Sequence, residues 1–212
     1  MGTTAGSNRQ PATTLRENLE IKANVHNVDA LRAAAKAIAT EYVGIMHQTD
    51  TYFDSREGRM KLREIRWENK GDQDPDQVND SAELIWYLRA DESATKASRY
   101  RIMSVDDPES MIASLDSAIG IRDIVRKRRE VFLHKNVRIH LDTVEDLGDF
   151  MELEAVQSSG DELSTASTAT WDEESKPGVQ LGLLDWMMDQ LGVKRDHLIA
   201  TSYIDLKLAS RR

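Results

Sequence analysis

The segment Asn18-Leu19-Glu20-Ile21-Lys22-Ala23-Asn24-Val25 decides the fold of this chain. Its polar and apolar residues alternate, and successive side chains of a β-strand point to opposite faces of the sheet. One face of this strand therefore carries carboxylate, ammonium and amide groups, whereas the other face is apolar. The same alternation recurs at Arg138-Ile139-His140-Leu141-Asp142 and at Phe150-Met151-Glu152-Leu153-Glu154. A sheet that closes with these polar faces inward would have an interior lined with both acids and bases.

The composition excludes several classes of protein. The chain has 212 residues, of which 40% are hydrophobic and 31% charged, as is typical of one globular domain. Its net charge of −9 argues against a nucleic-acid partner, because general nucleic-acid binders carry a basic excess. No apolar stretch approaches the roughly 20 residues of a membrane helix, so we expect no membrane partner. The chain has no cysteine, which excludes thiolate catalysis and agrees with the cytoplasmic location that we expect.

The expected elements describe a closed sheet with helices around it. We expect a disordered tail at 1–14 and a single domain at 15–212, which contains a flexible insertion at 158–178. Alternation and turn residues predict strands at 16–26, 43–54, 59–67, 82–91, 98–105, 122–134, 137–144, 148–157 and 203–208. Caps and helical spacing predict helices at 30–40, 106–120 and 179–192. Eight or nine mostly antiparallel strands with three helices predict an α+β fold: an eight-stranded antiparallel β-barrel, or tunnel, with helices packed outside.

Acidic residues on the polar faces are candidate metal ligands: Glu20, Asp142, Glu152 and Glu154. Glu152 and Glu154 are two residues apart on one strand, so their oxygen atoms can converge on one Mg²⁺ or Mn²⁺. Carboxylates gathered inside a barrel would repel each other, and a bound cation would relieve that repulsion. The alternative interpretation is a set of solvated charges or salt bridges to nearby arginines. We expect His140 to be a hydrogen-bonding wall residue rather than a ligand.

Basic residues form the second set on these faces: Lys22, Lys61, Arg63, Arg89, Lys96, Lys127, Arg129 and Arg138. Lys61 and Arg63 are spaced by two residues, as are Lys127 and Arg129, so each pair projects from one face of its strand. Lys and Arg supply charge-assisted hydrogen bonds to phosphate oxygens, and those of Arg are often bidentate. This set predicts a binding site for a polyanion such as a triphosphate.

Taken in order, these motifs resemble the CYTH domain, also called the triphosphate tunnel metalloenzyme superfamily. The segment 18–22 is similar to its Glu-x-Glu-x-Lys signature. Further matches lie at 48–53, 59–63, 87–89, 127–129, 138–142, 147–154 and 202–206. The resemblance implies an eight-stranded antiparallel tunnel that binds a triphosphate together with Mg²⁺ or Mn²⁺. Asn18 stands where the signature has its first Glu, which removes one charge from the metal side.

By position, the resemblance implies that Glu20, Glu152 and Glu154 bind the metal, with Asp142 beside them. It implies phosphate binding by the basic residues named above. Lys22, Glu20 and Asp142 are then the candidate catalytic residues, with Glu20 or Asp142 orienting the attacking water.

Three functions remain open from the sequence. The leading hypothesis is a metal-dependent hydrolase of a small-molecule triphosphate: tripolyphosphate, thiamine triphosphate or a nucleoside triphosphate. The second is a class IV-type adenylyl cyclase, which would make cyclic AMP and pyrophosphate from ATP held by the same tunnel residues. The third is a non-catalytic polyphosphate-binding module, suggested by Asn18. The oligomeric state is open as well, with a homodimer among the options.

Overall fold

Eight β-strands form the centre of this computed structural model, which describes residues 16–71, 80–89, 96–156 and 177–211. The strands are β1 (Arg16–Asn24), β2 (Glu41–Phe53), β3 (Arg59–Asn69), β4 (Ser81–Arg89), β5 (Lys96–Ser104), β6 (Ile121–His134), β7 (Val137–Val144) and β8 (Gly148–Val156). The expected tail at 1–14 lies outside the described residues, as does most of the insertion expected at 158–178.

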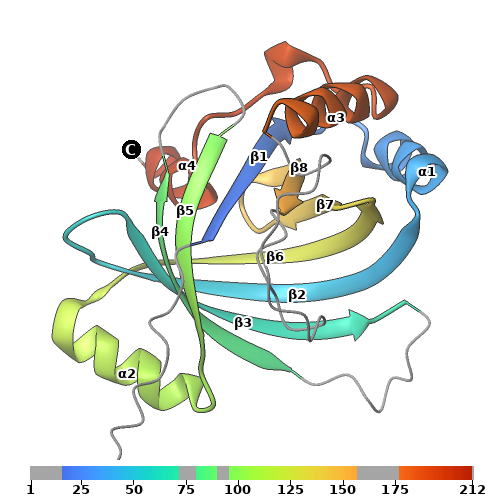
Figure 1. Ribbon diagram of the computed structural model, residues 1–212. Coiled ribbons are helices and arrows are strands. Elements are labelled where there is room, and N and C mark those ends of the chain that lie inside the picture. Colours follow the sequence, from blue (N-terminus) through green and yellow to red (C-terminus); the bar gives the residue numbers. More distant parts are fainter. Residues whose placement is uncertain (1–15, 72–79, 90–95, 157–176, 212) are drawn as a thin grey trace, which may run out of the picture.

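The strands close into a barrel in the order β1-β5-β4-β3-β2-β6-β7-β8 (Figure 1). Every neighbouring pair is antiparallel, and β1 completes the ring because it pairs with both β5 and β8. Glu20, for example, is opposite Lys96 on one side and opposite Glu154 on the other. The predicted antiparallel barrel of eight strands is confirmed.

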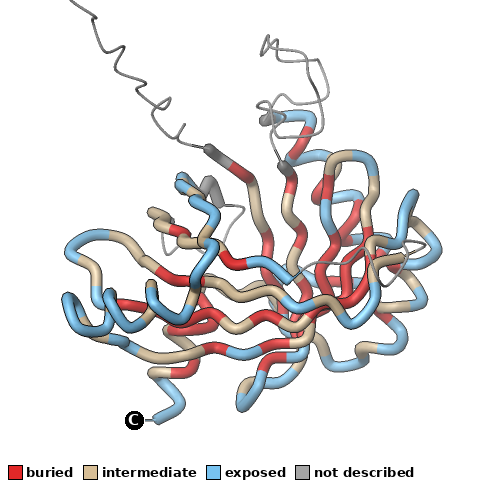
Figure 2. Tube along the Cα trace, turned by 90° about the horizontal axis from the view of Figure 1, so that it is seen from below, coloured by how far each residue is buried: buried red, intermediate tan, exposed pale blue. Residues whose placement is uncertain are grey.

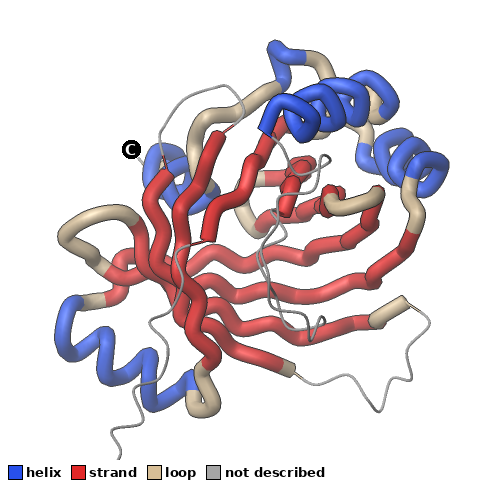
Figure 3. The backbone as a smooth tube through the Cα atoms, in the orientation of Figure 1, coloured by secondary structure: helices blue, strands red, loops and turns tan. Residues whose placement is uncertain are grey.

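In the described part of the chain, four α-helices and one short 3₁₀ helix lie around the sheet (Figure 3). They are α1 (Val28–Ile38), α2 (Pro108–Ile119), α3 (Pro177–Gln190), η3 (Arg195–His197) and α4 (Tyr203–Ser210). Helices α1 and α3 cover the outer apolar face of β1, β7 and β8, where Leu31 and Met187 pack with Ile21, Ile139 and Leu153. Buried positions accordingly run along the strands in Figure 2. Because the outer faces carry this hydrophobic core, the polar faces of the same strands point inward.

Helix α2 covers a different part of the barrel. The Asp107 side chain caps it by accepting a hydrogen bond from the Ser110 backbone N–H at 3.0 Å. Its Met111 and Leu115 pack against the cluster that contains Leu62. Within the described residues, no helix has both the length and the apolar composition needed to cross a membrane.

The prediction of a strand at 203–208 is wrong, because this segment forms the helix α4. Its alternating sequence is typical of a strand, but Ser202 caps a helix by accepting a hydrogen bond from the Asp205 backbone N–H. The buried residues are Tyr203, Ile204 and Lys207, a spacing that belongs to one face of a helix. Tyr203 and Ile204 pack with residues on the inward face of the barrel, namely Tyr52, Val125, Val144 and Phe150. Helix α4 therefore supplies part of the barrel's interior.

Candidate functional site

The polar faces of the strands meet inside the barrel. Residues that pair directly across two strands share a face of the sheet, so the strand register identifies the inward set. Glu152 pairs with Lys22 on one side and with His140 on the other, and Arg129 pairs with Asp142. The register therefore brings acids and bases of separate strands together in the interior, as the alternating sequence predicted.

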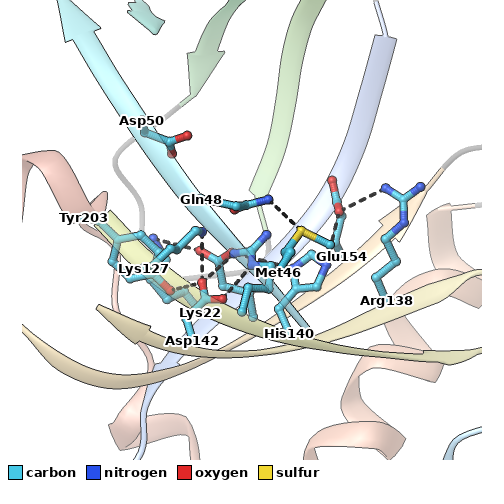
Figure 4. Close-up of polar contacts among 12 residues, drawn as sticks. Lys22, Met46, Gln48, Asp50, Lys127, Arg138, His140, Asp142, Glu154 and Tyr203 are labelled. Carbon is cyan, nitrogen blue, oxygen red and sulfur yellow. Dashed lines mark hydrogen bonds and ion pairs between the residues drawn. The ribbon is translucent and has the colours of Figure 1, made fainter. Parts of the chain in front are cut away.

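Asp142 lies at the centre of the larger polar network (Figure 4). Its carboxylate accepts hydrogen bonds from Arg129 Nε at 2.6 Å and from Arg129 Nη2 at 2.5 Å. It also accepts one from Lys127 Nζ at 3.0 Å and one from the Tyr203 hydroxyl at 2.9 Å. Four donors from two elements, β6 and α4, thus surround a side chain that is almost completely buried.

Glu152 extends this network to β1. Arg129 Nη2 contacts one of its oxygen atoms, and Lys22 Nζ lies 3.1 Å from the other. Lys22 Nζ is also 3.8 Å from the centre of the Tyr203 ring, which is a cation–π arrangement. The structure thus brings together five residues of the predicted site: Lys22, Lys127, Arg129, Asp142 and Glu152.

A second network surrounds Asp50 on β2. Its carboxylate accepts hydrogen bonds from Lys61 Nζ at 2.7 Å, from Arg63 Nε at 2.7 Å and from Arg63 Nη2 at 2.8 Å. Lys61 and Arg63 were predicted from the sequence, whereas Asp50 was missed. A signal existed, because Gln48-Thr49-Asp50 continues the polar alternation of its strand. Tyr203 was missed because its segment was expected to be a strand.

Burial and close charges change the protonation of both networks. Burial opposes ionisation of Asp142, but Arg129 and Lys127 outweigh it and hold its pKa below the usual range. Burial and the nearby Arg63 lower the pKa of Lys61 to about 7. Burial and Arg129 lower the pKa of Lys127 to about 8. Burial likewise opposes ionisation of Asp50, but Arg63 and Lys61 outweigh it and lower its pKa. Both aspartates are therefore ionised near neutral pH, whereas the lowered pKa values of the two lysines lie close to it.

Glu154 has different surroundings from Glu152. Asn18 Nδ2 donates to Glu154 Oε1 at 2.6 Å, and Arg138 Nη1 lies 3.4 Å from Oε2. The Asn18 Oδ1 atom is buried and has no hydrogen-bond partner in the described structure. The His140 ring lies between the two glutamates, 3.8 Å from Glu152 and 4.0 Å from Glu154, and burial together with Arg129 lowers its pKa.

A metal site is not already assembled here. Among the described residues, no three histidine or acidic side chains lie close enough to share an ion. The donors on this side of the barrel are nevertheless mostly hard oxygen atoms, which Mg²⁺ and Mn²⁺ prefer. The unpaired Asn18 Oδ1 beside Glu154 adds an amide oxygen that a cation could use. The residues present therefore fit a small divalent cation.

The strands also place the four remaining predicted residues. Glu20 is half-buried on β1 and pairs in register with Glu154. Arg138 contacts Glu154, but its side chain is 51% exposed. Arg89 and Lys96 occupy the ends of β4 and β5, and their side chains lie outside the described structure. The sites proposed for these four residues remain predictions.

Comparison with known proteins supplies independent information on this fold. The family model of the CYTH domain matches residues 16–182. No curated protein sequence matches the chain. The PH1012 protein of Pyrococcus horikoshii OT3 has a similar structure, with a TM-score of 0.67 and 22% identity over 89% of this chain and 98% of that chain.

Two further solved structures are similar. One is described as an adenylate cyclase candidate of Vibrio parahaemolyticus, with a TM-score of 0.64 and 18% identity over 91% of this chain and 98% of that chain. The other is HpAC1 of Hippeastrum, an adenylyl cyclase candidate described as having a dominant triphosphatase activity. It has a TM-score of 0.58 and 12% identity, over 92% of this chain and 96% of that chain. At such identities the likeness establishes a shared fold alone.

Proposed function

The chain belongs to the CYTH domain family, and on this premise we propose that it is a divalent-metal-dependent hydrolase of inorganic or organic triphosphates. The main support is the presence of two Lys-x-Arg pairs inside one closed barrel, Lys61 with Arg63 and Lys127 with Arg129. Their four basic groups can donate hydrogen bonds to a phosphate chain, and each pair keeps one net positive charge beside its aspartate when both bases are protonated. Lys22 lies close to the second pair and adds a fifth.

The basic residues would bind and orient the phosphate chain. A guanidinium has five N–H donors, so Arg63 and Arg129 keep donors beyond those that they give to aspartate. These remaining groups, together with Lys22, can form charge-assisted hydrogen bonds to phosphate oxygens. The same cations would stabilise negative charge that develops on the leaving phosphate. The walls of the barrel would limit access of bulk water to the reacting group.

We propose that Glu20, Glu152, Glu154 and the Asn18 amide oxygen hold the divalent metal. A bound Mg²⁺ or Mn²⁺ acts as a Lewis acid that polarises phosphoryl oxygen atoms.

Glu20 is the better candidate to accept a proton from the attacking water. Asp142 would be a poor base, because four donors cover its oxygen atoms and its pKa lies below the usual range. Glu20 is half-buried and pairs in register with Lys96 and Glu154.

The test is an assay of phosphate release from tripolyphosphate, thiamine triphosphate and ATP, each with Mg²⁺ and with Mn²⁺. We expect turnover of at least one substrate, and a loss of about 100-fold or more in kcat/KM for Arg129→Gln. Arg128→Gln is the matched control, because Arg128 lies on the outer face and pairs with Glu68 at 2.9 Å. Absence of phosphate release from every substrate, with either metal, would end the hydrolase proposal.

Two other functions give different results in the same experiment. A cyclase would convert ATP into cyclic AMP and pyrophosphate, and the names of the two structural neighbours from Vibrio and Hippeastrum make it the second candidate. A non-catalytic module would bind tripolyphosphate without turnover, in line with Asn18 at the metal side. A cytoplasmic location completes our proposal and is supported by the absence of cysteine.

A further inference from the structure

Two hairpins of the barrel carry the same arrangement of charged residues. On β2 and β3, Asp50 pairs directly with Arg63, and a lysine precedes that arginine by two residues. On β6 and β7, Asp142 pairs directly with Arg129, again with a lysine two residues before the arginine. We call Asp50 with Lys61 and Arg63 the first clamp, and Asp142 with Lys127 and Arg129 the second clamp.

The contacts inside the two clamps match atom by atom. In the first, the carboxylate accepts from Arg63 Nε at 2.7 Å, from Arg63 Nη2 at 2.8 Å and from Lys61 Nζ at 2.7 Å. In the second, the corresponding distances are 2.6 Å and 2.5 Å from Arg129 and 3.0 Å from Lys127. Each aspartate therefore holds one arginine by two parallel hydrogen bonds and one lysine by one hydrogen bond.

Neither aspartate is available to a ligand. Asp50 is 2% exposed and Asp142 is 1% exposed, and both carboxylates are covered by cationic donors. Two negative charges in the interior would also repel the phosphate chain if they met it directly. Any contribution of these residues to substrate binding must therefore pass through the lysines and arginines that they hold.

We propose that Asp50 and Asp142 are matched positioning residues, each of which fixes one Lys-x-Arg pair in the geometry that binds the phosphate chain. Long Lys and Arg side chains lose much conformational freedom on binding, so fixing them beforehand improves affinity and alignment. Each clamp keeps one net positive charge when both bases are protonated, and it therefore still attracts an anion. This role rests on the proposed function, and it assigns Asp142 to positioning rather than to metal binding.

Asp50 offers the cleaner test of the two. The side-chain donors that the structure places on it are Lys61 and Arg63, whereas Asp142 also accepts a hydrogen bond from Tyr203. A substitution at Asp50 therefore reports on one clamp without disturbing the contact with α4.

The experiment is a double-mutant cycle on the full chain, with Asp50→Asn, Arg63→Gln and the double variant. The kcat and KM for tripolyphosphate are measured, together with tripolyphosphate binding by calorimetry. We expect Asp50→Asn to lower kcat/KM by about 100-fold. Because Asp50 acts in part through Arg63 and in part through Lys61, Asp50→Asn should cost at least about threefold less in the Arg63→Gln background than in the wild-type background. Losses that multiply, or an Asp50→Asn variant that keeps the kcat/KM of the wild type, would overturn the positioning role.

A control and a second variant separate positioning from simple stabilisation. Glu68 forms an equally bidentate pair with Arg128 on the outer face, at 2.9 Å and 3.0 Å, so Glu68→Gln should leave kcat/KM unchanged. If Asp50→Asn proves unfolded by circular dichroism, Asp50→Glu replaces it, because this change keeps the charge and lengthens the side chain by one methylene. We then expect about tenfold lower kcat/KM with a folded protein, and an unchanged value refutes the clamp.

Different results would refute the proposed function and the clamps. A wild-type chain that neither binds nor hydrolyses tripolyphosphate refutes the proposed function and the clamps together. A chain that hydrolyses it, but in which the two substitutions act independently, refutes the clamps alone.

Discussion

Tyr203 reaches into the barrel from helix α4, and its hydroxyl donates a hydrogen bond to the Asp142 carboxylate at 2.9 Å. Its ring also lies 3.8 Å from Lys22 Nζ and packs against Phe150, with the ring centres 5.0 Å apart. Burial and the neighbouring Asp142 raise the pKa of Tyr203 well above its usual value, so the hydroxyl remains a donor at neutral pH. One side chain thus joins the last helix, β1 and the second clamp.

Substitution of Tyr203 should therefore reduce stability in two separable steps. Tyr203→Phe removes a buried hydrogen bond to a charged group, which typically costs about 1.5–3 kcal/mol. Tyr203→Ala also removes the ring and should cost about 3–5 kcal/mol. Unfolding in urea measures both. The control is Tyr42→Phe, because Tyr42 is 39% exposed and its hydroxyl lies 3.4 Å from Asn69. Equal stability of Tyr203→Phe and wild type would contradict the role given to this hydroxyl.

The pKa of Lys61, lowered to about 7 by burial and by Arg63, should make the proposed binding of polyphosphate dependent on pH. A bound anion favours the protonated lysine, so binding should draw protons from solution at pH 7, at most about half a proton for this group. As the pH rises above 7, more of the free protein carries a neutral lysine, and the affinity should fall. Lys127, with a pKa of about 8, extends the decline to higher pH.

Calorimetry in two buffers with different ionisation enthalpies measures this proton uptake. Tripolyphosphate itself exchanges protons near neutral pH, so the comparison is between wild type and Lys61→Met. The variant should take up fewer protons than the wild type at pH 7. Identical proton uptake in both proteins would show that Lys61 does not titrate on binding.

The outcome for particular residues shows which features a sequence can predict. Glu152 and Lys22 were predicted because a period of two is a local property that assigns each side chain to one face of its strand. Asp50 was missed because its importance depends on the register of β2 against β3, which places it opposite Arg63. Tyr203 was misjudged for a related reason. Its segment alternates as a strand does, but a local cap at Ser202 and burial against the barrel select the helix.

A backbone position on β2 gives a test of the barrel itself. Gly44 has φ +135°, and a Cβ atom there would lie 2.4 Å from the Asn69 carbonyl oxygen. It lies at the irregularity where the pairing of β2 with β6 shifts register, between Tyr42 and Gly44. Gly44→Ala should therefore destabilise the protein by about 2 kcal/mol or more.

The matched control for this position is Gly182→Ala. Gly182 lies inside α3, and no atom would contact an added Cβ within 4 Å. Alanine there should stabilise the fold by up to about 1 kcal/mol, because it has the higher helix propensity. Urea denaturation measures whether each substitution lowers or raises the free energy of unfolding. Two variants of equal stability would contradict the strain assigned to Gly44.

The charge missing at Asn18 should limit the affinity for metal. Asn18→Glu adds a carboxylate beside Glu154, which Asn18 now reaches through a hydrogen bond of 2.6 Å. Without metal the two carboxylates repel each other, so the melting temperature should fall. With Mn²⁺ the added ligand should raise the affinity about tenfold and restore the melting temperature, because a ligand that binds only the folded state stabilises it.

Titration with Mn²⁺ by calorimetry, in the absence of substrate, measures this effect separately from turnover. The control is Asn24→Glu, which adds the same charge at an exposed position on the same strand and the same face. Asn24→Glu should leave both the affinity and the melting temperature close to those of the wild type. If Asn18→Glu and Asn24→Glu bind Mn²⁺ equally well, the metal does not lie beside Glu154, and the ligand set must be sought elsewhere in the barrel.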